Sequence, residues 1–143
     1  MSSSNEQLEQ SLTAPPPKLS NELDNDITNQ APAMTGLKLA LAQQQFIVGD
    51  VIGNAKKMVE LAQNAREKGA NMIVFPELSL LGYPPEDLLL RPSLASRVKL
   101  AFELLYQVKD IVMLVGYPHI DQHGTFNSLA VIHNGQQKGF YHK

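Results

Sequence analysis

Glu77 is the residue of this sequence whose position best suits acid–base chemistry. It follows residues 71–75, an apolar run that predicts a strand buried on both faces, and Pro76 removes a backbone donor and should end that strand. Glu77 is therefore expected at the carboxyl end of a strand, the edge where open α/β sheets bind ligands. Gly82 and the prolines at 84–85 predict rigid turns beyond it, so Glu77 could serve as a general base or be an ordinary solvated loop carboxylate.

The stretch around Glu77 resembles the nitrilase, or carbon-nitrogen hydrolase, superfamily. In that superfamily a Phe-Pro-Glu element supplies the glutamate of a Glu-Lys-Cys triad, and residues 75–77 here read Phe-Pro-Glu. Residues 82–90 read Gly-Tyr-Pro-Pro-Glu-Asp-Leu-Leu-Leu and are similar to the amidase half of bacterial glutamine-dependent NAD synthetases. The resemblance extends from about Leu37 to Lys143, and so covers all of the chain except its first part.

Hydrolysis of a carboxamide needs a nucleophile, a base that activates it, and a donor where the oxyanion grows. The resemblance implies that Glu77 is the base, that Lys143 stabilises the oxyanion, and that Tyr83 lines the amide pocket. It also implies glutamine as the substrate, with ammonia and an acyl-enzyme thioester as the first products. Taken alone, a lysine after a strand is usually a solvated charge, but the hairpin predicted before Lys143 would support it and could aim it at Glu77. Glu86 and Asp87 instead suit a helix amino terminus.

The nucleophile of the triad has no counterpart, because the sequence contains no cysteine. The part that resembles the family is also shorter than a nitrilase-type domain, and the ATP-using synthetase domain of the NAD synthetases has no counterpart within these 143 residues. We therefore predict that this 143-residue chain alone has no glutaminase activity. By resemblance, ATP and Mg²⁺ belong to the absent synthetase domain. The chain itself is expected to hold no cofactor and no metal, since its four histidines lack a His-Glu-x-x-His pattern.

Strands and helices alternate along the part of the chain that must position these residues, which predicts an α/β layer. With the resemblance, the expected fold is the first half of a nitrilase-type α-β-β-α sandwich, a mixed sheet with two helices on one face. Asp50 or Asn54 is available to cap the first helix. The predicted order is a strand at 37–44, a helix from about 50 to 69, a strand at 71–75, a helix from 91–93 to about 108, a strand at 111–116, a turn at 121–125, and strands at 126–133 and 136–142 joined by an Asn-Gly turn at 134–135.

The first 33 residues differ in composition from the rest of the chain. They are rich in Ser, Asn, Gln and Pro, lack periodicity and carry a net charge of −4, which predicts a disordered acidic leader over residues 1–33. Residues 34–143 are interpreted as a partial carbon-nitrogen hydrolase (glutaminase) domain, truncated on its carboxyl-terminal side. Met34 lies at the join, so a second hypothesis is that translation starts there.

The overall composition is that of a soluble globular domain: 43% of residues are hydrophobic, 18% are charged, and the formal net charge is −2. This weak charge predicts neither a nucleic acid nor a membrane as partner. No apolar run approaches the ~20 residues of a membrane span, and the amino terminus lacks the pattern of a secretory signal. The expected location is therefore cytoplasmic, and the resemblance implies that the complete enzyme is a homo-oligomer.

Two further interpretations stay open. In the first, the chain is a non-catalytic interaction module that pairs with a full-length homologue through an exposed sheet edge. In the second, it is a fragment of another amidase of the nitrilase superfamily, although residues 82–87 favour the NAD synthetases. A half domain exposes the sheet edge and the apolar face that its missing part would cover, so we expect the 143-residue chain to be dimeric or poorly soluble.

Overall fold

The computed structural model describes residues 36–143 of the chain. The leader predicted over residues 1–33 and the alternative start at Met34 therefore lie outside the described residues. Within 36–143 the chain forms five strands, two α-helices and one short 3-10 helix.

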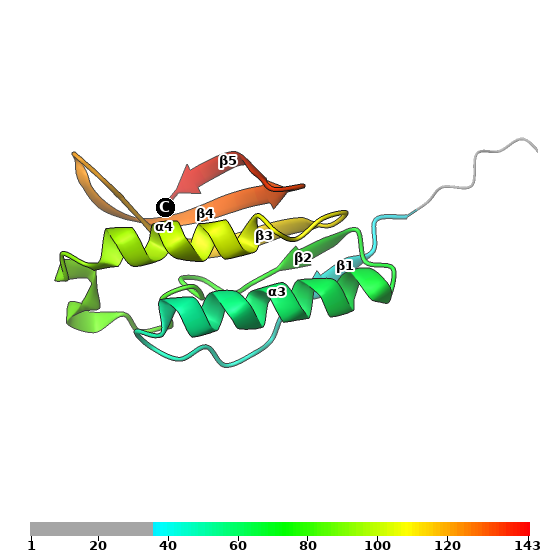
Figure 1. Cartoon of the computed structure of the whole chain (residues 1–143), viewed down its shortest axis with the longest axis horizontal. Helices are drawn as coiled ribbons and strands as arrows, with labels where there is room; N and C mark the ends of the chain where they lie inside the picture. Colours follow the sequence, from blue (N-terminus) through cyan, green and yellow to red (C-terminus); the bar gives the residue numbers. More distant parts are fainter. Residues whose placement is uncertain (1–35) are drawn as a thin grey trace, which may run out of the picture. The chain divides into compact units, whose positions relative to one another are not determined.

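The strands are β1 (Leu39–Leu41), β2 (Met72–Val74), β3 (Val112–Asp121), β4 (Gly124–His133) and β5 (Gln136–His142). They form one sheet in the spatial order β1-β2-β3-β4-β5 (Figure 1). β1, β2 and β3 are parallel, whereas β3, β4 and β5 form an antiparallel meander. The predicted mixed sheet is therefore confirmed.

Two helices, α3 (Val51–Glu67) and α4 (Leu94–Leu105), lie side by side over one face of the sheet (Figure 1). This arrangement confirms the prediction of two helices on one face. Each helix is the crossover between two parallel strands, α3 between β1 and β2 and α4 between β2 and β3. The 3-10 helix η1 (Glu86–Leu90) precedes α4, and it carries Glu86 and Asp87 in its first turn, where negative charge is favourable.

Asp50 is the residue that caps α3, because its carboxylate accepts a hydrogen bond from a backbone N–H of the first turn at 3.0 Å. Asn54, the other cap considered from the sequence, is buried and has a different role. Its side-chain Nδ2 donates to the carbonyl oxygens of Ile47 at 2.8 Å and Leu80 at 3.1 Å, and its Oδ1 accepts from the N–H of Ile47. Asn54 thereby ties the segment before α3 to the loop that follows β2.

The hydrophobic core lies between the two helices and the sheet. Ile73 of β2 and Met113 of β3 point into it and are 2% and 0% exposed. The buried apolar residues of α3 recur at intervals of three or four, and those of α4 are seven, one and three positions apart, so each set lies on one side of its helix. They are Val51, Ala55, Met58, Ala62 and Ala65 of α3, and Leu94, Ala101, Phe102 and Leu105 of α4.

The strand that leads to Glu77 is covered on one face only. β2 is shorter than the predicted strand at 71–75, and of its three residues Ile73 alone is buried. The prediction that this strand is buried on both faces is therefore wrong, because helices cover only one side of the sheet. β1 is also shorter than the predicted strand at 37–44.

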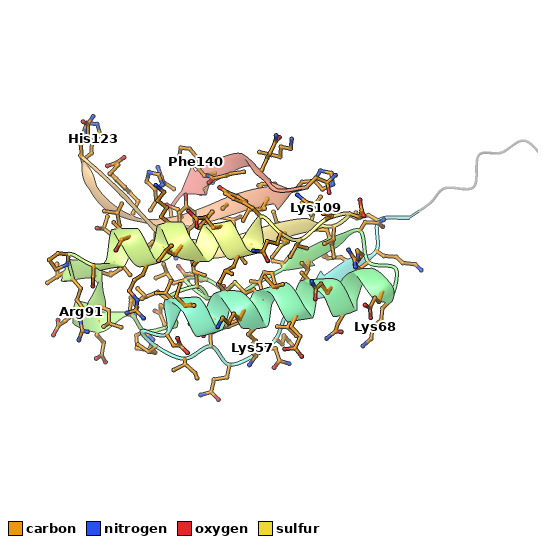
Figure 2. The ribbon with its side chains drawn as sticks, viewed as in Figure 1. Lys57, Lys68, Arg91, Lys109, His123 and Phe140 are labelled. Atoms are coloured by element: carbon orange, nitrogen blue, oxygen red, sulfur yellow. The ribbon has the colours of Figure 1, made fainter. Side chains whose placement is uncertain are left out.

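The antiparallel meander is longer than the sequence predicted. β3 continues past Gly116 to Asp121, the first residue of the predicted turn, because residues 117–121 pair with β4 in an unbroken ladder. The turn is reduced to residues 122–123, and His123 stands at the tip of this hairpin (Figure 2). The predicted turn between β4 and β5 is confirmed, with positive φ at Asn134 (50°) and Gly135 (80°).

Candidate active site

Glu77 lies just beyond the carboxyl end of β2, where the sequence placed it. On one side of it, the N–H of Phe75 donates to the carbonyl of Leu114 at 2.9 Å. On the other side, the N–H of Leu80 donates to the carbonyl of Gly116 at 3.0 Å. Both acceptors belong to β3, so Glu77 is carried on a turn that is bound to the sheet at each end.

Two glycines allow the turn that carries Glu77 to pack this closely. A Cβ atom at Gly116 would lie 2.6 Å from the carbonyl oxygen of Pro76 and 2.6 Å from the amide nitrogen of Leu78. Gly82 has a φ of +85°, and a Cβ there would lie 2.6 Å from the Cα of Val48. The unusual backbone turn predicted at Gly82 is therefore confirmed, and it lets the segment before α3 pack against the turn.

Lys143 meets Glu77 across 66 positions of sequence: its Nζ donates to Oε1 of Glu77 at 2.8 Å. The lysine follows directly on β5, and its backbone N–H donates to the carbonyl of Asn127 at 2.9 Å. The meander thus supports Lys143 and directs its side chain to Glu77, as the sequence led us to expect. Both side chains remain open to solvent, with 73% of Lys143 and 47% of Glu77 exposed.

Asn127 is a site residue that the sequence reasoning missed. Its side-chain Nδ2 donates to Oε1 of Glu77 at 2.5 Å, the same oxygen that binds Lys143. The alternation of side chains along β4 could have indicated it. Asn127, Leu129 and Val131 share one face of this strand, and Asn127 is the only polar residue of the three. An amide at the end of an apolar row, next to the predicted lysine, is a candidate for a site.

The hydrogen bonds and charges at the site favour the ionised form of both residues. The hydrogen bond from Lys143, then the one from Asn127 and the charge of Lys143, lower the pKa of Glu77. The hydrogen bond to Glu77 and the negative charge of Glu77 raise the pKa of Lys143. At neutral pH the pair is therefore a carboxylate and an ammonium group, which are the forms that a base and an oxyanion partner require.

Tyr83, the predicted lining of the amide pocket, shares a hollow with Glu77. The hollow has a volume of about 370 Å³ and is walled by residues 44–48, Ser79 and Tyr83. Tyr83 is 67% exposed. The hydroxyl of Ser79 is buried in this region and has no hydrogen-bond partner among residues 36–143.

A second hollow, of about 280 Å³, adjoins the other side of Glu77 on the face of the sheet that the helices leave open. Its apolar wall includes Leu129 and Tyr141, and its polar wall is formed by Asn127 and Lys143. Glu77 therefore lies between two open hollows. The arrangement can move a proton and stabilise a negative charge, but it contains no thiol, because the sequence has no cysteine.

Two other kinds of feature, a metal cluster and a membrane-spanning helix, are absent from the part of the chain that the structure describes. Among residues 36–143 there is no group of three or more His, Asp or Glu side chains that could hold a metal ion. Over the same range no helix is both long and apolar enough to cross a bilayer. The candidate active site of the described residues therefore consists of Glu77, Lys143, Asn127 and Tyr83.

The fold and the site together define the class of this protein. A glutamate after the second strand of a mixed α/β layer is paired with a lysine after the fifth strand. The family model for carbon-nitrogen hydrolases matches residues 38–143, and the chain belongs to this family. The resemblance inferred from the Phe-Pro-Glu element is thus confirmed.

Within this family the chain is similar to several glutamine-dependent NAD(+) synthetases. The chain is 48% identical over 111 residues to the synthetase of Acinetobacter baylyi and 44% identical over 110 residues to that of Aquifex aeolicus, covering 77% and 75% of this chain. The solved glutamine-dependent NAD+ synthetase of Acinetobacter baumannii, with 46% identity, superposes with a TM-score of 0.73 over 75% of this chain. The chain spans about one fifth of the length of these relatives (20%, 19% and 20%).

Proposed function

We propose that this chain provides the base and the oxyanion-stabilising lysine of a glutamine amidohydrolase site, which supplies ammonia within a glutamine-dependent NAD synthetase. The observation that carries the proposal is the 2.8 Å contact between Nζ of Lys143 and Oε1 of Glu77. The 48% identity to the Acinetobacter baylyi synthetase favours glutamine over other amides. Residues 82–87 favour the same choice over another amidase of the superfamily.

The nucleophile in this proposal is a cysteine thiol from outside these 143 residues, contributed by a continuation of the polypeptide or by another chain. Glu77 accepts the thiol proton, and the sulfur attacks the side-chain carbonyl carbon of glutamine. The carbonyl oxygen becomes an oxyanion beside Lys143. Glu77 returns its proton to the departing nitrogen, which leaves as ammonia, and water then hydrolyses the thioester to glutamate.

The ion pair explains why the base and the cation belong together. While Lys143 binds Glu77, it lowers the pKa of the carboxylate, which keeps Glu77 ionised but weakens it as a base. When Glu77 takes up a proton, its attraction for Lys143 falls. The ammonium group is then released to the oxyanion, which carries the new negative charge.

Tyr83 is proposed to line the pocket for the glutamine side chain. It borders the hollow of about 370 Å³ that Glu77 shares with residues 44–48. A hollow of this size, walled by an aromatic ring and a carboxylate, suits a small polar substrate.

The remaining parts of the activity are assigned outside this chain. The chain alone is expected to be inactive in glutamine hydrolysis, because it lacks the thiol. ATP and Mg²⁺ would be used by a synthetase domain that is not part of this sequence. We further propose that the complete enzyme is cytoplasmic and a homo-oligomer, with no nucleic-acid or membrane partner.

A chimera tests the proposed function. The 143-residue chain replaces the matching segment of the Acinetobacter baylyi synthetase, and NAD(+) formation is measured with glutamine and, separately, with ammonium salt as the nitrogen source. We expect activity with both sources. Changing Glu77→Gln in the chimera should abolish the glutamine-dependent rate and leave the ammonia-dependent rate unchanged, since the second reaction does not need the base.

Glu103→Gln is the matched control for this experiment. Glu103 is an exposed glutamate of α4, away from Glu77, so its change should affect neither rate. A chimera that uses ammonia but not glutamine, with a correctly folded amidase part, would overturn the proposal. Equal losses in both rates after Glu77→Gln would also contradict it, because they indicate a structural role.

A second candidate function is a non-catalytic interaction module that pairs with a full-length homologue. It is favoured by Leu39 and Leu41, which are 50% and 66% exposed on the face that the helices leave open. Two measurements distinguish the two candidate functions: the DNA sequence beyond the Lys143 codon and the intact mass of the native polypeptide. A frame that continues into a cysteine-bearing strand favours the hydrolase, whereas a stop codon with a native mass near 15.8 kDa favours the module.

A further inference from the structure

Two donors converge on one oxygen of Glu77. Nζ of Lys143 lies 2.8 Å from Oε1, and Nδ2 of Asn127 lies 2.5 Å from the same atom. Among residues 36–143 no hydrogen bond reaches Oε2. A carboxylate can accept about four hydrogen bonds, two at each oxygen. Oε1 therefore accepts its full number from Lys143 and Asn127, and Oε2 can still accept a hydrogen bond or a proton.

Asn127 also holds the backbone of Lys143, because its carbonyl oxygen accepts the lysine N–H at 2.9 Å. The register of β4 and β5 makes this contact possible, since Ser128 is paired with His142 one residue away. On the opposite face of the sheet, Oγ of Ser128 and Nδ1 of His142 are 2.6 Å apart. Asn127 is therefore fixed in place by the ladder and touches both members of the ion pair.

We propose that Asn127 is a positioning residue: it holds Oε1 of Glu77 and the backbone of Lys143, so that Oε2 is the oxygen that receives the proton of the nucleophile. This inference rests on the proposed function for the identity of the nucleophile. The contacts of Asn127 do not depend on it. Asn127 touches neither substrate nor thiol in this scheme, and it acts only through Glu77 and Lys143.

The chemistry of the amide supports this role. Nδ2 of Asn127 can only donate, so it cannot take the proton that Glu77 is meant to receive. The hydrogen bond it makes also stabilises the carboxylate and contributes to the lowered pKa of Glu77. The other polar groups of the two hollows beside Glu77 include Lys143 at the end of β5, Tyr141 of β5, Tyr83 and Ser79 of the same loop, and the neutral Gln44 and Gln45 before α3.

The first test measures Glu77 in the 143-residue chain by carbon-13 NMR of its carboxyl group as a function of pH. Asn127→Ala removes the donor, and Asn127→Asp keeps the shape but replaces the donor with a second carboxylate. Both changes should raise the pKa of Glu77, and Asn127→Asp should raise it more. Thr125→Ala, on the same strand but outside the hollow that Asn127 shares with Glu77, should leave the pKa of Glu77 unchanged.

The second test follows the pH dependence of the chimera described above. Asn127→Ala should lower kcat/KM for glutamine by about 10- to 100-fold, mostly through kcat, because a misplaced base still allows substrate to bind. It should also move the acid limb of the profile to higher pH, a change that a merely structural role would not produce. The ammonia-dependent rate should stay the same.

These measurements separate the two proposals. If the pKa of Glu77 is unchanged in both Asn127→Ala and the isosteric Asn127→Asp, the positioning role is overturned. If the unsubstituted chimera does not use glutamine, the proposed function is overturned, and the titration in the 143-residue chain still decides whether Asn127 holds Glu77. Thermal unfolding of each variant confirms that the titrated protein is folded.

Discussion

The two faces of the sheet differ in what covers them. On the helix-covered face, Ile73, Met113 and Val115 are at most 2% exposed. On the opposite face, which we call the open face, Leu39, Leu41 and Tyr141 are 50–70% exposed. The strands are the same on both sides, so the difference lies only in the α3 and α4 layer.

The site belongs to the open face. Asn127 and Lys143 line a hollow there together with Glu77, while the buried residues of the same strands face the helices. One face therefore stabilises the fold, and the other presents a charged pair within apolar surroundings. An uncovered apolar face of this kind marks a surface that meets another layer or another molecule.

Because only one face of the sheet is covered, truncating a side chain should lower the free energy of unfolding much more on the helix-covered face than on the open face. Met113→Ala should lower the free energy of unfolding by about 2–5 kcal/mol, because it leaves a cavity in the core. Leu41→Ala on the open face should change it by less than about 0.5 kcal/mol. Urea unfolding of the two variants measures both values, and similar losses would show that the open face is covered in solution.

The turn that carries Glu77 packs closely on β3 at Gly116, so a larger residue there should disturb it. Gly116→Ala places a Cβ within 2.6 Å of backbone atoms of Pro76 and Leu78, so we expect a loss of about 1–3 kcal/mol and a displaced Glu77. Gly139→Ala on β5 is the control, because no atom lies within 4 Å of its added Cβ. Urea unfolding gives the stabilities, and the carboxyl resonance of Glu77 reports its displacement. If the Glu77 carboxyl resonance of Gly116→Ala has the same chemical shift as in the unchanged chain, Gly116 is not required for the position of Glu77.

The exposed leucines lead to a prediction about association rather than stability. Replacing Leu39 and Leu41 with Ser should shift the 143-residue chain toward monomer in analytical ultracentrifugation, with little change in unfolding free energy. Leu100→Ser removes an equally exposed leucine from the outer side of α4 and should not change the mass. If the unsubstituted chain is already monomeric, the exposed leucines of the open face do not mediate association, and this prediction is wrong.

Periodicity and turn chemistry predicted most of the helix-covered half of the molecule. The alternation of strands and helices, the cap at Asp50 and the Asn-Gly turn at 134–135 each depend on neighbours in sequence, and each is confirmed. The place of Glu77 followed in the same way, from an apolar run that ends at Pro76. The extension of β3 to Asp121 was missed, since Pro118 is not typical of a strand interior.

The open face could be predicted only in part. The contact of Lys143 with Glu77 was expected from resemblance, but the contact of Asn127 depends on the register between β4 and β5, which a single sequence does not specify. The same lack of long-range information led to the error about β2. An apolar run indicates burial, but it does not say whether one face or two will be covered.

The smallest expected effect concerns the ion pair of the open face. Removing the charge in Glu77→Gln should lower the melting temperature only slightly, because both partners are exposed and water screens them. The pKa of Glu77 is lowered in the folded state, so its contribution is complete above its ordinary value of 4.5 and is lost as the pH falls through the folded pKa. The pKa of Lys143 is raised, so its contribution is complete below 10.5 and is lost at higher pH.

The difference in melting temperature between the unchanged chain and Glu77→Gln should therefore be widest between about pH 5 and pH 10 and close at both ends. High salt should also reduce this difference in melting temperature, because it screens the charges of the ion pair. Glu103→Gln on α4 provides the baseline for an exposed glutamate. A difference as large as that of Met113→Ala would mean that the ion pair is part of the structural core, and the contrast between a stabilising face and an open, functional face would then have to be abandoned.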